Sequence, residues 1–422
     1  MQEFFNISPR LKELNEEVRK ELSNIFAKRD EITEYNQLKV LKAFINNGVS
    51  ENHFAASTGY GYGDRGREVL EETFAEIMGA EDSLIRHNFV SGTHTLSVAL
   101  FGILRPGDTV LSVTGIPYDT IHPIFGITDS CGSLKEFGVK YDQVDLNEKG
   151  LPDLEAIAER LKQEKVKMVY IQRSRGYTLR KSLSVAEIGE IVKVVREIAP
   201  ETVVMVDNCY GEFVEKTEPT EVGADIIAGS LIKNPGGGIA RTGGYIAGRK
   251  DLIEMCSYRL TTPATGKEVG ATLGMNRELF MGVFHAPHVV GEAVKTAIFA
   301  SRLFEKLGYK VTPTSTEDRA DIIQALLLEN EQNLTAFCQG IQSGSPVDAF
   351  VTPEAWDMPG YDSKVIMAAG TFTLGASVEL SADAPIREPF AVWMQGGLNF
   401  HSGAMCVLLA AEKMLKLSDK NG

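Results

Sequence analysis

The sequence predicts an α/β protein with a mostly parallel sheet in a large domain and a smaller, mixed α+β domain at the C-terminal end. Between residues 80 and 262, short apolar runs alternate with amphipathic helical segments, the pattern of strands buried on both faces of a parallel sheet. Beyond residue 262, long helical segments are mixed with strand-like runs. We therefore expect a helical arm over 1–50, a large domain over 51–262 and a small domain over 263–422.

The N-terminal arm is expected to be an amphipathic helix, because apolar residues recur at spacings of three and four from Leu11 to Leu22. Such a helix packs against the body of the protein or against a partner subunit. A glycine-rich hinge follows at 57–65 and leads into a helix that carries Leu70 on its apolar face and stops at Gly79.

The large domain contains five strand-like runs and at least one well-marked helix. The helix is predicted over 184–199, where Ser184 and Glu187 have the spacing of a capping box. Since parallel strands need right-handed crossovers, the site is expected at the carboxyl ends of the strands. The strand-like runs are 109–114, 166–172, 202–207, 225–228 and 244–247.

The small domain is predicted from a change of pattern after residue 262. It contains two long helical segments and three shorter strand-like runs. The helical segments are 292–307 and 322–334, and the strand-like runs are 350–351, 365–368 and 377–380.

Composition excludes several classes of protein. Lys and Arg number 43 and Asp and Glu 57, and the net charge of −14 disfavours nucleic acid or an anionic membrane as a partner. Apolar residues make up 43%, enough for a sizeable core. The five cysteines are widely spaced and odd in number, which disfavours a disulfide framework. No signal peptide or membrane-spanning run is visible, so we expect a cytoplasmic protein.

Two charged residues stand at the ends of apolar strands. Asp207 closes the run 202–207, and Lys233 follows 26 residues later, between a short strand and the glycine loop 236–238. Because both strands belong to one sheet, the two side chains should converge on one crevice. A lysine in an apolar crevice is expected to have a lowered pKa and to form Schiff bases.

A turn at 91–93 supplies a third element. Ser91, Gly92 and Thr93 precede a predicted helix over 96–104, and a helix N-terminus presents free backbone N–H groups to an anion such as phosphate. The turn is not a Walker loop, because no G-x-x-x-x-G-K-[ST] occurs. A lysine, a carboxylate and a phosphate turn are together the fixtures of pyridoxal phosphate chemistry.

The order of these elements resembles the fold-type I enzymes of the cystathionine lyase and methionine γ-lyase group, and within it the methionine γ-lyase-like, or aluminium resistance, branch. The resemblance covers nearly the whole chain and implies the fold-type I transferase-like architecture for the large domain. The motifs that carry it are GYGYGDRGRE, SGTHT, RPGDTVLSVTGIPYDT, VDNCYGEF, GSLIKNPGGG, AGTFTLGASVELSADAPIR and QGGLNF.

The resemblance implies pyridoxal 5'-phosphate as the cofactor and assigns three catalytic residues. Lys233 would bind the cofactor and move protons, and Tyr118 would stack on the ring and protonate a departing thiolate. The substrate carboxylate needs a planar, two-pronged donor. After Arg319 the only arginine is Arg387, so if the second domain supplies the clamp, as in the family, it is Arg387. Asp207 would pair with the ring nitrogen.

The phosphate would be held by Ser91, Gly92 and Thr93, with a further hydroxyl from Ser230. The family's hydroxyl residue directly before the lysine is replaced by Ile232 in this chain. The family's asparagine for the phenolic oxygen of the cofactor is also missing. Tyr210, three residues after Asp207, sits where other fold-type I enzymes use a tyrosine for that oxygen.

The hinge resembles the segment that reaches the phosphate of the neighbouring subunit. Tyr60, Tyr62 and Arg65 are its candidate contacts, and spacing does not choose between the two tyrosines. This implies a homodimer as the active unit, and a homotetramer is expected.

The expected reaction is carbon–sulfur bond cleavage in a sulfur-containing amino acid of the cystathionine, methionine or cysteine type, with release of thiol, keto acid and ammonia. A transaminase, an aldolase or a racemase on the same scaffold stays open, as does a non-catalytic metal-tolerance protein. The histidines, including His87 and His94, lack the spacing of a metal site, and we expect no bound metal.

Overall fold

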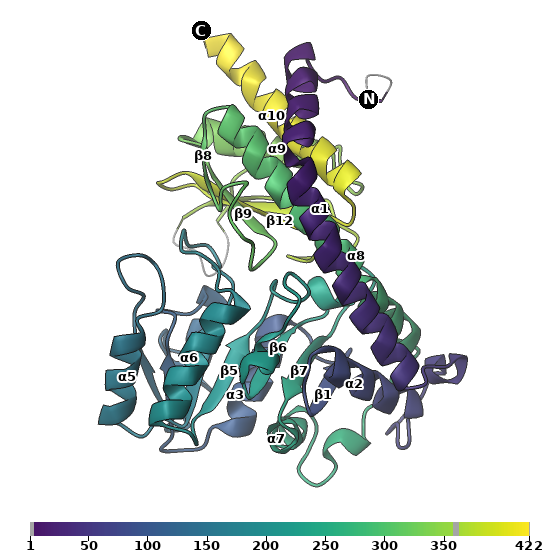
Figure 1. The fold of residues 1–422 in the computed structure, drawn as a ribbon, viewed down its shortest axis with the longest axis vertical. Helices are drawn as coiled ribbons and strands as arrows, with labels where there is room; N and C mark the ends of the chain where they lie inside the picture. Colours follow the sequence, from purple (N-terminus) through teal and green to yellow (C-terminus); the bar gives the residue numbers. More distant parts are fainter. Residues whose placement is uncertain (1–3, 358–362, 422) are drawn as a thin grey trace. The chain divides into compact units, whose positions relative to one another are not determined.

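The computed structural model describes residues 4–357 and 363–421. The chain forms two compact units, one of residues 35–286 and one that combines residues up to 34 with those from 287 onward. Figure 1 traces the chain through them.

Both divisions between the units fall inside long helices. The first lies in α1 (Pro9–Asn46) and the second in α8 (Asn276–Lys306). These divisions differ from the boundaries expected at 50/51 and 262/263, and that division into three domains stays a prediction.

Unit 35–286 is built on a seven-stranded sheet with the order β1-β7-β6-β5-β4-β2-β3. The five strands from β2 to β6 run parallel to one another, and β7 is antiparallel to both β6 and β1. The expected α/β class with a mostly parallel sheet is confirmed. The strands are β1 (Asp82–Arg86), β2 (Thr109–Ser112), β3 (Lys140–Gln143), β4 (Met168–Gln172), β5 (Val203–Asp207), β6 (Ile226–Ser230) and β7 (Gly244–Gly248).

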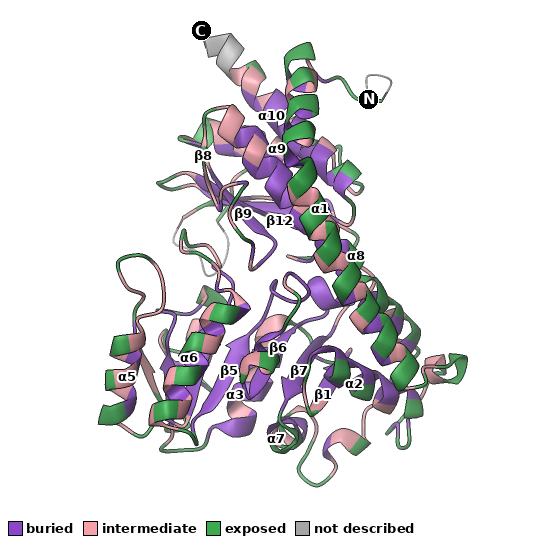
Figure 2. Ribbon diagram, in the orientation of Figure 1, coloured by how far each residue is buried: buried purple, intermediate pink, exposed green. Residues whose placement is uncertain are grey.

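Helices cover the sheet of this unit. Helix α3 packs against α7 and strand β6, while α5 packs beside α6 (Figure 1). Figure 2 shows the central strands buried and the outer sides of α5 and α6 exposed. Apart from α1 and α8, the α-helices here are α2 (Arg65–Ile77), α3 (Gly92–Ile103), α4 (His122–Phe125), α5 (Leu154–Gln163), α6 (Val185–Ile198) and α7 (Lys250–Leu260).

Local signals explain where several of these elements begin. Helix α6 starts after Ser184, whose hydroxyl accepts the N–H of Glu187 at 3.2 Å while the Glu187 carboxylate accepts the Ser184 N–H at 2.8 Å. The predicted capping box is confirmed. Strands β4, β5 and β6 are buried along their whole length, as their apolar runs predict.

The second unit contains an antiparallel five-stranded sheet with the order β10-β11-β12-β9-β8. Helix α9 packs on β10 and β11 and against α10. The elements are β8 (Lys310–Thr312), β9 (Ile323–Leu327), α9 (Glu331–Ser343), β10 (Val365–Ala368), β11 (Ser381–Pro385), β12 (Ala391–Gln395) and α10 (Phe400–Asn421).

Three predictions for the C-terminal region were wrong. The helix predicted over 322–334 is strand β9 followed by the start of α9, because β9 pairs with β8 and β12 and the Asn330 side chain caps α9. No strand forms at 350–351, and the strand predicted over 377–380 begins only at Ser381. The strand over 365–368 is confirmed as β10.

No helix in the described part of the chain is long and apolar enough to cross a membrane.

Candidate active site

The site lies where three parallel strands end side by side. The last residue of β4, Gln172, pairs with the last residue of β5, Asp207, and Asp207 pairs with Ala228 of β6. Lys233 lies shortly after the end of β6 at Ser230. The structure therefore brings the predicted acid and the predicted lysine to one edge of the sheet, as the strand pattern implies.

Lys233 lies close to Tyr210 and to the turn at Gly92. Its Nζ is 4.3 Å from the ring centroid of Tyr210. A Cβ atom placed on Gly92 would lie 3.9 Å from that Nζ, 3.7 Å from the Sγ of Cys209 and 3.3 Å from the Cβ of Ser230. The phosphate turn, the segment after β5 and the segment after β6 thus meet around Gly92, where any larger residue would fill the space.

The pKa of Lys233 does not follow the prediction from sequence. Burial lowers it, as expected, but the nearby Cys209, Tyr210, Asp207 and Tyr118 raise it by more, so that the net pKa lies above the ordinary value of lysine. The prediction of a lowered pKa was wrong, because strand pattern reveals an apolar crevice and does not reveal the acidic groups that share it.

Asp207 is buried, with 8% of its surface exposed. Its Oδ1 accepts the N–H of Cys209 at 3.2 Å and its Oδ2 accepts the hydroxyl of Tyr170 at 3.4 Å. Burial raises the pKa of Asp207, and Lys233 opposes this rise without cancelling it. Tyr210, three residues on, has a left-handed backbone with φ of 71°, a strained conformation of the kind that gathers at functional sites.

The predicted phosphate turn forms the N-terminus of α3. Ser91 is its N-cap, and its hydroxyl accepts the N–H of His94 at 3.0 Å. Gly92 and Thr93 begin the helix, so their N–H groups have no intrahelical carbonyl to bind. The Thr93 hydroxyl lies 3.0 Å from that of Thr120.

Ser230 supplies a second indication of a ligand. Its Oγ is buried and has no hydrogen-bond partner in the described part of the chain. A buried hydroxyl without a partner costs free energy, about 1–3 kcal/mol. Together with the helix N-terminus at Gly92, it fits the phosphate group of pyridoxal phosphate.

Tyr118 is half-buried and is positioned by the last residue of β4 and by the segment that follows this strand. Its N–H donates to Oε1 of Gln172 at 2.7 Å, and its ring meets that of Tyr177 edge to face, 5.7 Å between centroids. Sequence reasoning missed Gln172. The sequence did contain an indication of it, a polar residue at the end of a buried strand, just as Asp207 ends the neighbouring strand.

The hinge residues Tyr60 and Tyr62 are exposed by 75% and 65%, with ring centroids 5.7 Å apart. Arg67 fixes the backbone beneath them, donating to the carbonyl oxygens of Gly61 at 2.7 Å and Gly270 at 2.6 Å. Arg65 is exposed and pairs with two glutamates of its own helix. The role of the hinge toward a neighbouring subunit stays a prediction.

Arg387 belongs to the second unit. It is exposed and follows strand β11, where its carbonyl accepts the N–H of Phe390 at 2.8 Å. Its role as the carboxylate clamp stays a prediction.

Two histidines, His87 and His94, flank the turn at 91–93. The Nδ1 of His94 accepts the N–H of Val90 at 3.2 Å, and burial lowers the pKa of both His87 and His94. Within residues 4–357 and 363–421, no group of three or more His, Cys, Asp or Glu side chains is arranged to hold a metal ion.

Residues 11–415 match the methionine gamma-lyase family. The chain belongs to this family. The expected resemblance to the group, including its aluminium resistance branch, is confirmed.

Close relatives cover nearly the whole chain. The uncharacterized protein YnbB of Bacillus subtilis is 47% identical over 408 residues, 96% of this chain and 97% of the relative. The structure of a candidate cystathionine beta-lyase involved in aluminium resistance, from Clostridium acetobutylicum, is 52% identical with a TM-score of 0.94, over 97% of this chain and 96% of the other. That of a carbon–sulfur lyase involved in aluminium resistance, from Clostridium novyi, is 51% identical with a TM-score of 0.93, over 96% of both chains.

A more distant likeness concerns the fold alone. The pyridoxal-5'-phosphate-dependent protein YhfS of Escherichia coli is 16% identical, with a TM-score of 0.62 over 92% of this chain and 97% of its own. The fold-type I class implied by the motifs is confirmed.

Proposed function

We propose that this protein is a pyridoxal-phosphate-dependent carbon–sulfur lyase that acts on a sulfur-containing amino acid of the cystathionine, methionine or cysteine type and releases a thiol, a keto acid and ammonia. Membership of the methionine gamma-lyase family supports the cofactor and the reaction class. The name of the Clostridium novyi relative, a carbon–sulfur lyase, agrees with it.

One observation carries the proposal. Lys233, the carboxylate of Asp207, the unpartnered hydroxyl of Ser230 and the helix N-terminus at Gly92 come together at the carboxyl ends of neighbouring strands. An amine, an acid and a phosphate site are the groups that pyridoxal phosphate requires from a protein, and when bound it stabilises a carbanion at the substrate Cα.

The chain's own residues divide this work. The N–H groups of Gly92 and Thr93 and the Ser230 hydroxyl would hold the phosphate, and Asp207 would keep the pyridine nitrogen protonated. The Lys233 amine would bind the cofactor and move a proton from the substrate Cα. Its neighbours raise the pKa of the free Lys233 side chain, and only the neutral amine can act as a nucleophile or a base.

Tyr118 and Arg387 would act on the substrate. The Tyr118 hydroxyl would protonate the thiolate as it leaves, and the guanidinium of Arg387 would hold the α-carboxylate through two parallel hydrogen bonds. Tyr60 or Tyr62, together with Arg65, would reach the phosphate of the neighbouring subunit in a homodimer. Two such homodimers would associate into a homotetramer.

The cofactor is tested by absorption spectroscopy of the purified protein reconstituted with pyridoxal phosphate. We expect a yellow protein whose colour is lost in Lys233→Ala and kept in Lys250→Ala, which removes an exposed lysine. A wild-type protein that stays colourless after reconstitution would overturn the proposal.

The reaction is tested by incubating the reconstituted enzyme with cystathionine, cysteine and methionine while keto acid and ammonia are assayed together. Equal amounts of both products support the lyase. Keto acid without ammonia, with the cofactor converted to its amine form, would identify a transaminase instead.

A further inference from the structure

Tyr170 contacts the acid of the site from a neighbouring strand. It lies in β4 opposite Met205 of β5, and since side chains alternate along a strand, Tyr170 shares a sheet face with Asp207, two residues beyond Met205. Its hydroxyl donates to Oδ2 of Asp207 at 3.4 Å, and the whole residue is inaccessible to solvent. The motifs used to predict the site do not include it.

We propose that Tyr170 is a positioning residue that fixes the Asp207 carboxylate for the ring nitrogen of the bound cofactor. The inference rests on the proposed function. Tyr170 would not contact the substrate, because it would act only through Asp207.

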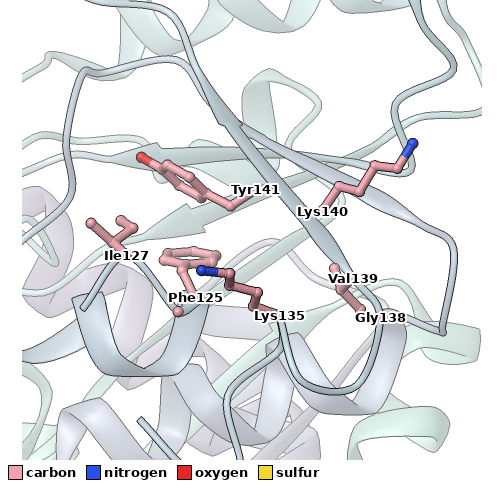
Figure 3. Close-up of a pocket in the computed structure, with 8 residues that line it drawn as sticks. Phe125, Ile127, Lys135, Gly138, Val139, Lys140 and Tyr141 are labelled. Carbon is pink, nitrogen blue, oxygen red and sulfur yellow. The ribbon is translucent and has the colours of Figure 1, made fainter. Parts of the chain in front are cut away.

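The ring of Tyr170 is held by other aromatic rings. Phe125 meets it edge to face, 5.4 Å between centroids, and Tyr141 packs against Phe125 in turn, with 5.1 Å between their centroids. Figure 3 shows the Phe125 ring beside that of Tyr141, where both line a pocket of about 530 Å³. The Tyr141 hydroxyl donates to Oε1 of Gln143 at 2.8 Å. A packed ring has few rotamers, so its hydroxyl stays aimed at the carboxylate.

The hydroxyl of Tyr170 is a permanent donor. Burial, and after it the charge of Asp207, raise its pKa well above the ordinary value of tyrosine, so it keeps its proton. With the N–H of Cys209 on Oδ1 and Tyr170 on Oδ2, both carboxylate oxygens have a donor and the plane of the group is set. Hydrogen bonds of this kind favour the charged form of Asp207, which is the form that can pair with a protonated ring.

The test compares four full-length proteins with the wild type by titrating each with pyridoxal phosphate and following its absorption. Tyr170→Phe keeps the ring and removes the hydroxyl. Tyr141→Phe is the matched control, because it removes a hydroxyl from the same group of rings, one that donates to Gln143 and not to Asp207. Asp207→Asn and the double variant Asp207→Asn with Tyr170→Phe complete a double-mutant cycle.

We expect Tyr170→Phe to weaken cofactor affinity about tenfold, the size expected for a hydrogen bond to a charged group, and Tyr141→Phe to leave it unchanged. In the Asp207→Asn background the Tyr170 substitution should cost less than threefold, because the group it positions has lost its charge. Equal losses in both backgrounds, or no loss in Tyr170→Phe, would overturn the inference. Wild-type protein that binds no cofactor would instead overturn the proposed function, and the inference with it.

Discussion

Folding buries the carboxyl group of Glu212 completely, and its ionisation should lower stability as the pH rises from 4.5 to about 8. It is 0% exposed, its Oε1 accepts the hydroxyl of Tyr245 at 2.7 Å, and its Oε2 has no partner in the described part of the chain. Burial raises its pKa to about 8, although the Tyr245 hydrogen bond opposes the rise.

The sign of the pH dependence follows from this raised pKa. Below its ordinary value of 4.5 the group is protonated in both the folded and the unfolded chain and costs nothing. As the pH rises toward 8, the unfolded chain releases the proton while the folded chain keeps it, so the free energy of unfolding falls by about 1.4 kcal/mol per pH unit. The full loss is about 5 kcal/mol, reached once the pH exceeds the folded pKa.

Replacement of Glu212 by glutamine should remove this slope. The amide oxygen can still accept the Tyr245 hydroxyl, but a buried NH2 group without partners costs about 1–3 kcal/mol. We therefore expect Glu212→Gln to be less stable than the wild type at pH 5 and more stable at pH 8. The assay is the difference in thermal midpoint between the two proteins, measured by calorimetry from pH 5 to 8.5.

The matched control is Glu190→Gln, which neutralises an exposed carboxylate on α6 and should give a difference that hardly varies with pH. Other buried groups, Asp207 among them, contribute to the wild-type slope, but they are present in every protein compared and cancel in the differences. Parallel curves for wild type and Glu212→Gln across this range would refute the assignment of a raised pKa to Glu212.

Three further predictions concern the fold and the site. Gly92→Ala places a Cβ 3.3 Å from that of Ser230, so it should weaken pyridoxal phosphate binding about tenfold, the loss of roughly one good contact, while the circular dichroism spectrum stays unchanged. Asn36→Ala removes two hydrogen bonds, at 3.0 and 2.9 Å, from α1 to backbone carbonyls of the segment after β5, and should lower the free energy of unfolding by about 2–3 kcal/mol in urea titrations. Ser184→Ala deletes the cap of α6 and should cost about 1 kcal/mol in the same titration, with Ser184→Thr nearly neutral.

Much of the site could be predicted because its residues stand at strand ends. Asp207 and Lys233 end or follow buried apolar strands, and parallel strands of one sheet finish at a common edge, so their convergence follows from pattern alone. The turn at Gly92 could be predicted for a similar reason, since it begins a helix and the first N–H groups of a helix have no intrahelical carbonyl to bind. The order of these motifs also identified the family.

The errors and omissions have a common physical cause. The segment 322–334 is as apolar as a buried helix, and only pairing with β8 and β12 makes its first part a strand. The pKa of Lys233 depends on which acidic groups surround it, and those groups come from segments more than twenty residues away in the chain. Tyr170 and Gln172 looked like ordinary residues of a buried strand.

The sequence by itself determined the alternation of strands and helices, the apolar core and the residue types at the strand ends, because periodicity and capping are local properties of the chain. Only the tertiary structure decided which atoms meet there: that a tyrosine of β4 reaches the carboxylate at the end of β5, that a serine hydroxyl is buried without a partner, and that the lysine is more basic than its apolar strand suggests. Hydrogen bonds and pKa values depend on distances of a few ångströms between distant segments, and those distances are set by packing.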